Sequence, residues 1–156
     1  MTDPAPTRVV ADADVLAADL LVGGPSRAAL DHVREHSWTT LVASDPLLDD
    51  AEAVIADLAD ASLARDWRAR AAEACELVDH PAEDHPALAA AYRGGAMHLL
   101  TLDESLLSAS AGAAIRGRVE TSVRHPRAFD TLFDAESLYR EAVGGTYPGP
   151  DRDPRA

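Results

Sequence analysis

The stretch DHPALAAAYRGGAMHLLTLD, residues 84–103, decides the fold. Pro86 can open a helix at its first turn and the glycine pair at 94–95 can end it, so a short Ala-rich helix is expected between them. The apolar run at 97–102 then predicts a buried strand, and Asp103 follows it directly. A helix that leads straight into a buried strand is typical of an α/β protein with a parallel sheet.

The rest of the chain repeats this alternation of helices and strands. Further strands are expected at 8–11, 38–43 and 118–123, and helices at 15–22, 25–36, 46–60, 63–77, 126–132 and 134–142. Strands separated by helices pair in parallel through right-handed crossovers. We therefore predict an α/β fold in which helices flank a central parallel sheet of four or five strands in three layers.

This fold is expected to occupy a single domain over residues 8–143. Residues 1–7 are expected to form a flexible leader. Residues 144–156 are rich in Gly, Pro, Asp and Arg, a composition that predicts a disordered tail. No apolar run approaches the ~18 residues of a membrane span, and no signal peptide is recognisable, so we expect a cytoplasmic protein without membrane contact.

The composition is strongly acidic. The chain of 156 residues has one cysteine and a formal net charge of −13, and all 14 of its basic residues are arginine. One cysteine excludes an intramolecular disulfide and Cys-rich zinc sites. Carboxylates without lysine are typical of a protein that is soluble in molar salt, and the codon bias of a GC-rich genome is the alternative explanation. The charge opposes simple attraction to nucleic acid, so such a partner would need local basic patches or metal ions.

Four acids are expected at one edge of the sheet. The carboxyl ends of parallel strands meet at the same edge, where sites form. The first expected strand runs into Asp12 and the third into Asp103, while Asp50 and Asp84 could reach this edge from helix starts. Clustered carboxylates repel each other unless a cation neutralises them, and Mg²⁺ and Mn²⁺ prefer oxygen ligands. We therefore predict a divalent-metal site that activates water to hydrolyse a phosphodiester.

Each of these acids also has an ordinary structural interpretation. Asp84 and Asp103 could cap the helices that follow them, and Asp14 could be an exposed turn residue. Asp50 was assigned to the site because it lies beside an apolar stripe at helical spacing, whereas Asp49 falls nearly opposite that stripe. The stripe is formed by Leu47, Ala51, Val54 and Leu58.

Several other side chains are weaker candidates. Ser44 and Thr101 could support metal ligands by hydrogen bonds, although capping and strand roles suit them equally. A basic segment could contact phosphate or pair with the abundant carboxylates; its members are Arg116, Arg118, Arg124, His125 and Arg127. A smaller one comprises Arg65, Trp67, Arg68 and Arg70. A zinc site at His80, His85 and His98 has little support, because no Cys partner accompanies them.

Four stretches resemble motifs of the PIN-domain family: RVVADADVL (8–16), LVASDPLLDDA (41–51), residues 84–103, and VETSVRHPRAF (119–129). The resemblance covers about residues 8–133. It implies a Mg²⁺- or Mn²⁺-dependent endoribonuclease that cleaves single-stranded or structured RNA, with the metal held by Asp12, Asp50, Asp84 and Asp103. The acidic composition further resembles PIN-like proteins of halophilic archaea. The family commonly has Glu as its second acid, and Asp50 is shorter by one methylene.

Two alternatives remain open at this point. A non-catalytic PIN-like module would bind RNA or a protein partner, such as an antitoxin, and keep only a weak metal site. A phospho-acceptor receiver domain would also place acids after the first strand, but it needs a lysine and this chain has none. By analogy with PIN domains, a homodimer through Leu132, Phe133 and Leu138 is a further expectation.

Overall fold

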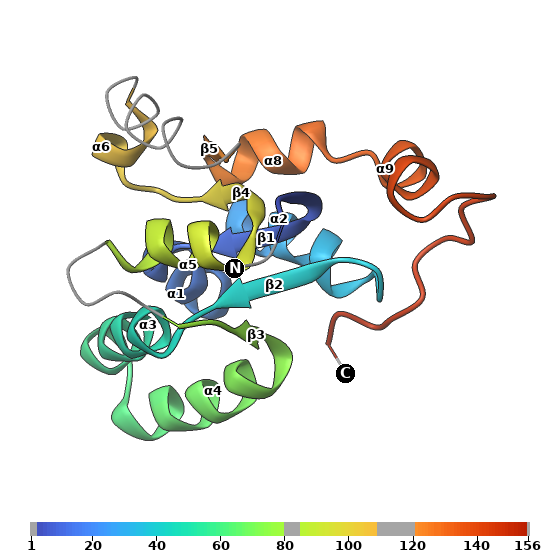
Figure 1. Ribbon diagram of the computed structural model, residues 1–156. Helices are drawn as coiled ribbons and strands as arrows, with labels where there is room; N and C mark the ends of the chain where they lie inside the picture. Colours follow the sequence, from blue (N-terminus) through green and yellow to red (C-terminus); the bar gives the residue numbers. More distant parts are fainter. Residues whose placement is uncertain (1–2, 80–84, 109–120, 156) are drawn as a thin grey trace.

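The structure is an α/β fold built on a parallel sheet. A computed structural model of the chain describes residues 3–79, 85–108 and 121–155. Five strands form one sheet in the order β3-β2-β1-β4-β5, and every pair is parallel (Figure 1). Their bounds are β1 Ala5–Ala11, β2 Thr40–Ala43, β3 Glu76–Leu77, β4 Ala96–Leu100 and β5 Ser122–Arg124. The predicted parallel sheet flanked by helices is confirmed.

Helices connect and flank these strands. They are α1 (Ala13–Leu21), α2 (Gly24–Arg34), α3 (Asp45–Leu58), α4 (Ala61–Ala74), α5 (Pro86–Gly94), α6 (Glu104–Leu107), α8 (Pro126–Leu132) and α9 (Ala135–Ala142). The predicted helix and strand within residues 85–103 are α5 and β4. Gly95 adopts the left-handed conformation (φ 64°) that ends α5. None of the described helices is both long and apolar enough to span a membrane.

One face of the sheet is covered by α5. Gly94 approaches β2 so closely that a Cβ atom there would lie 2.4 Å from a methyl carbon of Val42, which explains why glycine stands at this position. Val42 pairs with Val10 of β1. Arg8, two residues before Val10 and therefore on the same face, donates a hydrogen bond to the carbonyl of Gly94. These contacts make α5 one outer layer of the fold.

The other face is covered by α8 and α2. The ring of His98 in β4 meets the ring of Phe129 in α8 edge-on, with centroids 5.3 Å apart. His98 pairs with Val9, whose side chain points away from that of Val10 because neighbouring strand residues alternate. Helices α2 and α8 pack against each other. The three-layer arrangement is consistent with a PIN-like fold.

The edges of the expected elements shift for identifiable reasons. The helix expected to reach residue 77 ends at Ala74, because the next residues pair with the free side of β2 as β3. The strand expected from residue 38 begins at Thr40, because the Thr39 hydroxyl donates to the carbonyls of Val33 and His36 and holds a turn. Of the strand expected at 118–123, residues 118–120 lie outside the described part.

Within the described residues, parts of the expected leader and tail make defined contacts. Residues 5–7 of the expected leader belong to β1, where the amide of Ala5 donates to the carbonyl of Gly95 over 2.9 Å. The expected disordered tail has defined contacts with α2 and the turn after it. Tyr147 bonds to His36, and Asp151 accepts hydrogen bonds from both the amide and the hydroxyl of Ser37. Specific side-chain partners therefore outweigh the Gly- and Pro-rich composition of this segment.

Candidate site at the carboxyl ends of β1 and β4

Asp12 stands where β1 ends and α1 begins. Its Oδ1 accepts a hydrogen bond from the amide of Ala13 over 2.8 Å, and its Oδ2 accepts one from the hydroxyl of Thr101 over 2.8 Å. The residue is only 7% exposed. A carboxylate buried in this way needs partners, and here they are neutral donors rather than cations. Asp12 therefore brings an almost uncompensated negative charge to the sheet edge.

Thr101 connects Asp12 to Asp103. Thr101 is fully buried, and while its hydroxyl donates to Asp12, the same oxygen accepts from the amide of Asp103 over 3.0 Å. The carboxylate of Asp103 caps α6 by accepting from the amide and the hydroxyl of Ser105 at 2.9 and 2.7 Å. These bonds, helped by the nearby His85, hold the pKa of Asp103 below its usual value. Asp103 therefore caps α6 and also lies at the candidate site.

Asp14 is the acid that the sequence analysis left out of the site. It is half-buried, and its two carboxylate oxygens each lie 3.3 Å from the amide of Leu102. Burial first, and then the negative charges of Asp12 and Asp103, raise its pKa. The charges of Asp12 and Asp103 thus act on Asp14, although burial has the larger effect. Only the register of β1 against β4 reveals this proximity, because Asp14 and Leu102 are 88 residues apart.

Asp50, the other described acid predicted for the site, stands in α3 rather than at the end of a strand. It is exposed, and no hydrogen bond or ion pair within the described residues links it to the other three acids. The buried stripe of this helix is Leu47, Leu48, Ala51 and Ile55 rather than the expected one, and Leu58 is 72% exposed. The helix is turned toward α4, where Arg68 pairs with Asp45 and Asp49. This rotation carries Asp50 further to the water side than expected. Asp84 lies outside the described residues.

No arginine pairs with the three carboxylates in the described part of the chain, and His85 near Asp103 is the one positive group found to act on them there. None of them forms an ion pair there, whereas arginines elsewhere pair readily with acids, as Arg34 does with Asp19. Among residues 3–79, 85–108 and 121–155, no three His, Cys, Asp or Glu side chains are grouped closely enough to hold a metal ion. Oxygen donors of the right chemical type are thus gathered here, but the described side chains alone do not complete a metal site.

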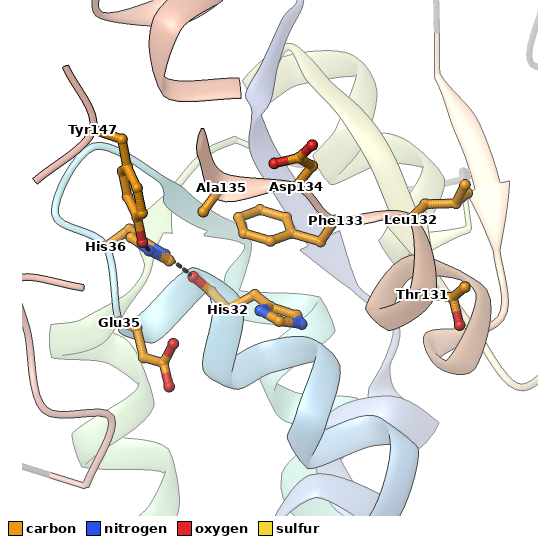
Figure 2. A pocket seen from close by; sticks show the side chains of 9 residues that line it. All are labelled: His32, Glu35, His36, Thr131, Leu132, Phe133, Asp134, Ala135 and Tyr147. Carbon is orange, nitrogen blue, oxygen red and sulfur yellow. Dashed lines mark hydrogen bonds between the residues drawn. The ribbon is translucent and has the colours of Figure 1, made fainter. Parts of the chain in front are cut away.

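An open cavity of about 600 Å³ lies elsewhere, between the end of α2, the link from α8 to α9, and the tail (Figure 2). Within it, His32 and His36 form an H-x₃-H pair that the sequence analysis overlooked. Both ring nitrogens of His36 are occupied, by the carbonyl of His32 at 2.6 Å and the hydroxyl of Tyr147 at 2.7 Å. His32 bonds to Asp130 and stacks on Phe133. These histidines therefore tie α2 to α8 and the tail.

The fold and the carboxylates define this protein as a three-layer α/β domain with an acidic cluster at the carboxyl edge of its sheet. The chain belongs to a family described as a family of unknown function (DUF7384), whose model matches residues 3–155. No match was found among curated proteins or among solved structures.

Proposed function

We propose that this chain is a metal-dependent endoribonuclease whose chemistry takes place at the carboxyl ends of β1 and β4. The observation that carries the proposal is the bond between the Thr101 hydroxyl and Asp12, because it fixes acids from both central strands at one edge of the sheet. Ligand and catalytic sites of parallel α/β sheets form at this edge. The proposed site residues are Asp12, Asp14 and Asp103, with Asp84 as a further candidate.

The electrostatics of the cluster favour a bound cation. Burial, and then the charges of Asp12 and Asp103, raise the pKa of Asp14, because both make its ionised form less favourable. Hydrogen bonds from Ser105 lower the pKa of Asp103 and so favour its negative charge. A divalent cation would neutralise it, and Mg²⁺ and Mn²⁺ are the ions that suit carboxylate oxygens. The acids would hold that ion, while Thr101 keeps Asp12 in place.

The proposed reaction is phosphodiester hydrolysis. A divalent ion held by carboxylates lowers the pKa of bound water and neutralises charge on a phosphate. The protein's own contribution would be to orient Asp12 through Thr101 and to hold Asp103 through Ser105. RNA as the substrate is proposed from the resemblance of the motifs to the PIN-domain family, and the three-layer fold is consistent with it.

A non-catalytic module that binds RNA or a protein partner is the second candidate. Two observations favour it: Asp50 is exposed on α3, and the described side chains alone group no three potential metal ligands. Such a module would retain the acidic edge without cleaving. The two candidates differ in one property, which is turnover of RNA in the presence of a divalent ion.

Cleavage of an end-labelled single-stranded RNA in molar KCl with Mn²⁺ separates these candidates. We expect the wild-type chain to cleave, and EDTA to stop it. Asp12→Asn should abolish cleavage while keeping the fold, because the amide oxygen of asparagine can still accept from the amide of Ala13. Asp57→Asn, at an exposed acid of α3, is the matched control and should cleave at the wild-type rate.

Circular dichroism of each variant must show the same helix content before rates are compared. If Asp12→Asn still cleaves RNA, the carboxyl ends of β1 and β4 are not the catalytic site. Folded wild-type protein that binds RNA but never cleaves it with Mn²⁺ would favour the binding module.

A further inference from the structure

The end of β5 and the first turn of α8 carry three basic side chains, Arg124, His125 and Arg127, here called the basic strip. β5 lies next to β4 in the sheet. The amide of Thr101 donates to the carbonyl of Arg124 over 3.0 Å. The strip therefore begins one strand away from the residue that holds Asp12. It is the part of the basic sequence segment 116–127 that falls within the described residues.

The arginines of the strip are among those that form no ion pair within the described part of the chain, whereas four others do. Arg8, Arg34, Arg68 and Arg155 all form ion pairs with acids. Arg124 and Arg127 form no ion pair within the described part of the chain, although acids far outnumber bases in this protein. The buried Nε of Arg124 also lacks a hydrogen-bond partner there. An unpaired guanidinium in so acidic a chain is available to an external anion.

The partly buried ring of His98 faces Arg124. His98 pairs with Ser122 and lies on the same side of the sheet as Arg124. Its buried Nδ1 has no hydrogen-bond partner among the described residues. Burial, and then the charge of Arg124, lower the pKa of His98, which places the two groups within electrostatic reach of each other. No described carboxylate forms an ion pair with either of them.

We propose that the basic strip binds the phosphate backbone of a single RNA strand and lays it beside the acidic cluster. Arginine guanidinium groups suit phosphate oxygens because they present several donors in a fixed plane. Such contacts fix the position of a strand without reading its sequence. The net charge of −13 makes a local basic element necessary for any polyanion to approach the cluster. This inference rests on the proposed function for the identity of the polymer.

The other basic segment is a weaker candidate for the same role. In α4, Arg68 is engaged with Asp45 and Asp49. This helix packs on α3 and β3, and β3 and β5 are opposite edges of the sheet. A strand bound there would lie away from the ends of β1 and β4. Arg65, exposed on α4, therefore provides a control substitution with the same change in charge.

Fluorescence anisotropy of a labelled single-stranded RNA, titrated with the full chain in EDTA, tests the proposal without cleavage. Affinities are measured over a series of KCl concentrations in which circular dichroism shows an unchanged fold. Arg124→Gln and Arg127→Gln should each weaken binding. The plot of log affinity against log salt should also become less steep in each variant. The magnitude of its negative slope should fall by about 0.7, the value for one lost phosphate contact to a single strand. Arg65→Gln should match the wild-type slope.

The outcomes separate this inference from the proposed activity. The inference is overturned if Arg124→Gln and Arg127→Gln have the same RNA affinity and salt slope as wild type. It is also overturned if Arg65→Gln loses as much RNA affinity as they do, or if the wild-type chain binds no RNA. Because Arg127 is exposed, its variant gives an answer even if Arg124→Gln fails to fold. Strip-dependent binding without any cleavage in Mn²⁺ would support the inference while refuting the nuclease.

Discussion

The hydroxyl of Thr101 donates a 2.8 Å hydrogen bond to the carboxylate of Asp12, across 89 residues of sequence. Both residues follow directly after central strands of the sheet. The bond therefore links the end of β1 to the end of β4 and keeps a buried carboxylate in one orientation. It is the contact on which the geometry of the candidate site most depends.

Thr101→Val should destabilise the fold. Valine has nearly the same shape, but it removes the donor to a carboxylate that is only 7% exposed. A lost hydrogen bond to a charged group costs about 1.5–3 kcal/mol, so the free energy of unfolding in urea should fall by that amount. Thr101→Ser keeps the hydroxyl and is the control. If valine and serine variants unfold at the same urea concentration, the bond does not stabilise Asp12.

Asp14→Asn should stabilise the fold increasingly as the pH rises from acid toward neutral. The pKa of Asp14 is raised in the folded chain from the ordinary value of 3.8, first by burial. Between the unfolded and folded pKa values the native state binds more protons, so the ionised carboxylate lowers stability as pH rises through that window. Asparagine removes this penalty.

The measurement is the difference in melting temperature between Asp14→Asn and wild type. It is recorded from pH 3 to pH 7 in buffers without divalent ions. Taking the difference cancels the other acids that titrate in the same range. A difference that stays constant with pH, or becomes less favourable to the variant at neutral pH, would contradict the shared negative environment of the cluster.

Tyr147→Phe should loosen the tail. The Tyr147 hydroxyl is the partner of His36 Nε2, and His36 is only 2% exposed. Removing it leaves a buried ring nitrogen unpaired, which costs about 1–3 kcal/mol. Hydrogen exchange should quicken at Asp151 and Arg152, whose amides donate to the carbonyl of Glu35.

The control for the tail is Tyr92→Phe, since no hydrogen bond of the Tyr92 hydroxyl is found within the described residues. Equal unfolding free energies for both tyrosine variants would show that the tail adds no stability through His36.

Cys75 should resist thiol reagents in the folded protein. Burial raises the pKa of its thiol to about 11, although Arg34 acts in the opposite direction. The reactive form is the thiolate, so little of it exists near neutral pH. Labelling with a thiol-reactive dye at pH 8 should be slow in buffer and fast in urea. Rapid labelling of the native chain at this pH would contradict the burial of Cys75.

The sequence predicts the sheet and two acids of the site for the same physical reason. An apolar run after a Pro-to-Gly helix marks β4, and the residue after such a run must lie at the carboxyl edge, which locates Asp103. The same argument locates Asp12. The orientation of α3 was not predicted in this way, because the helix buries Leu48 and Ile55 in place of Val54 and Leu58, which turns Asp50 outward.

Long-range pairing accounts for what the sequence did not reveal. A supporting hydrogen bond from Thr101 was among the expectations. Its partner Asp12, and the contact of Asp14 with the chain after β4, follow only from the register of β1 against β4, which a period-two pattern does not specify. The order of the tail likewise comes from individual partners such as His36 and Ser37 rather than from composition.

We propose that the acids at the ends of β1 and β4 form a divalent-cation site. Calorimetric titration with Mn²⁺ tests this proposal without any assumption about the RNA. Wild type should bind Mn²⁺, Asp12→Asn and Asp103→Asn should bind at least about tenfold more weakly, and Asp57→Asn should bind as wild type does. A wild-type chain that takes up no Mn²⁺, or an Asp12→Asn variant that binds it equally well, would contradict the account.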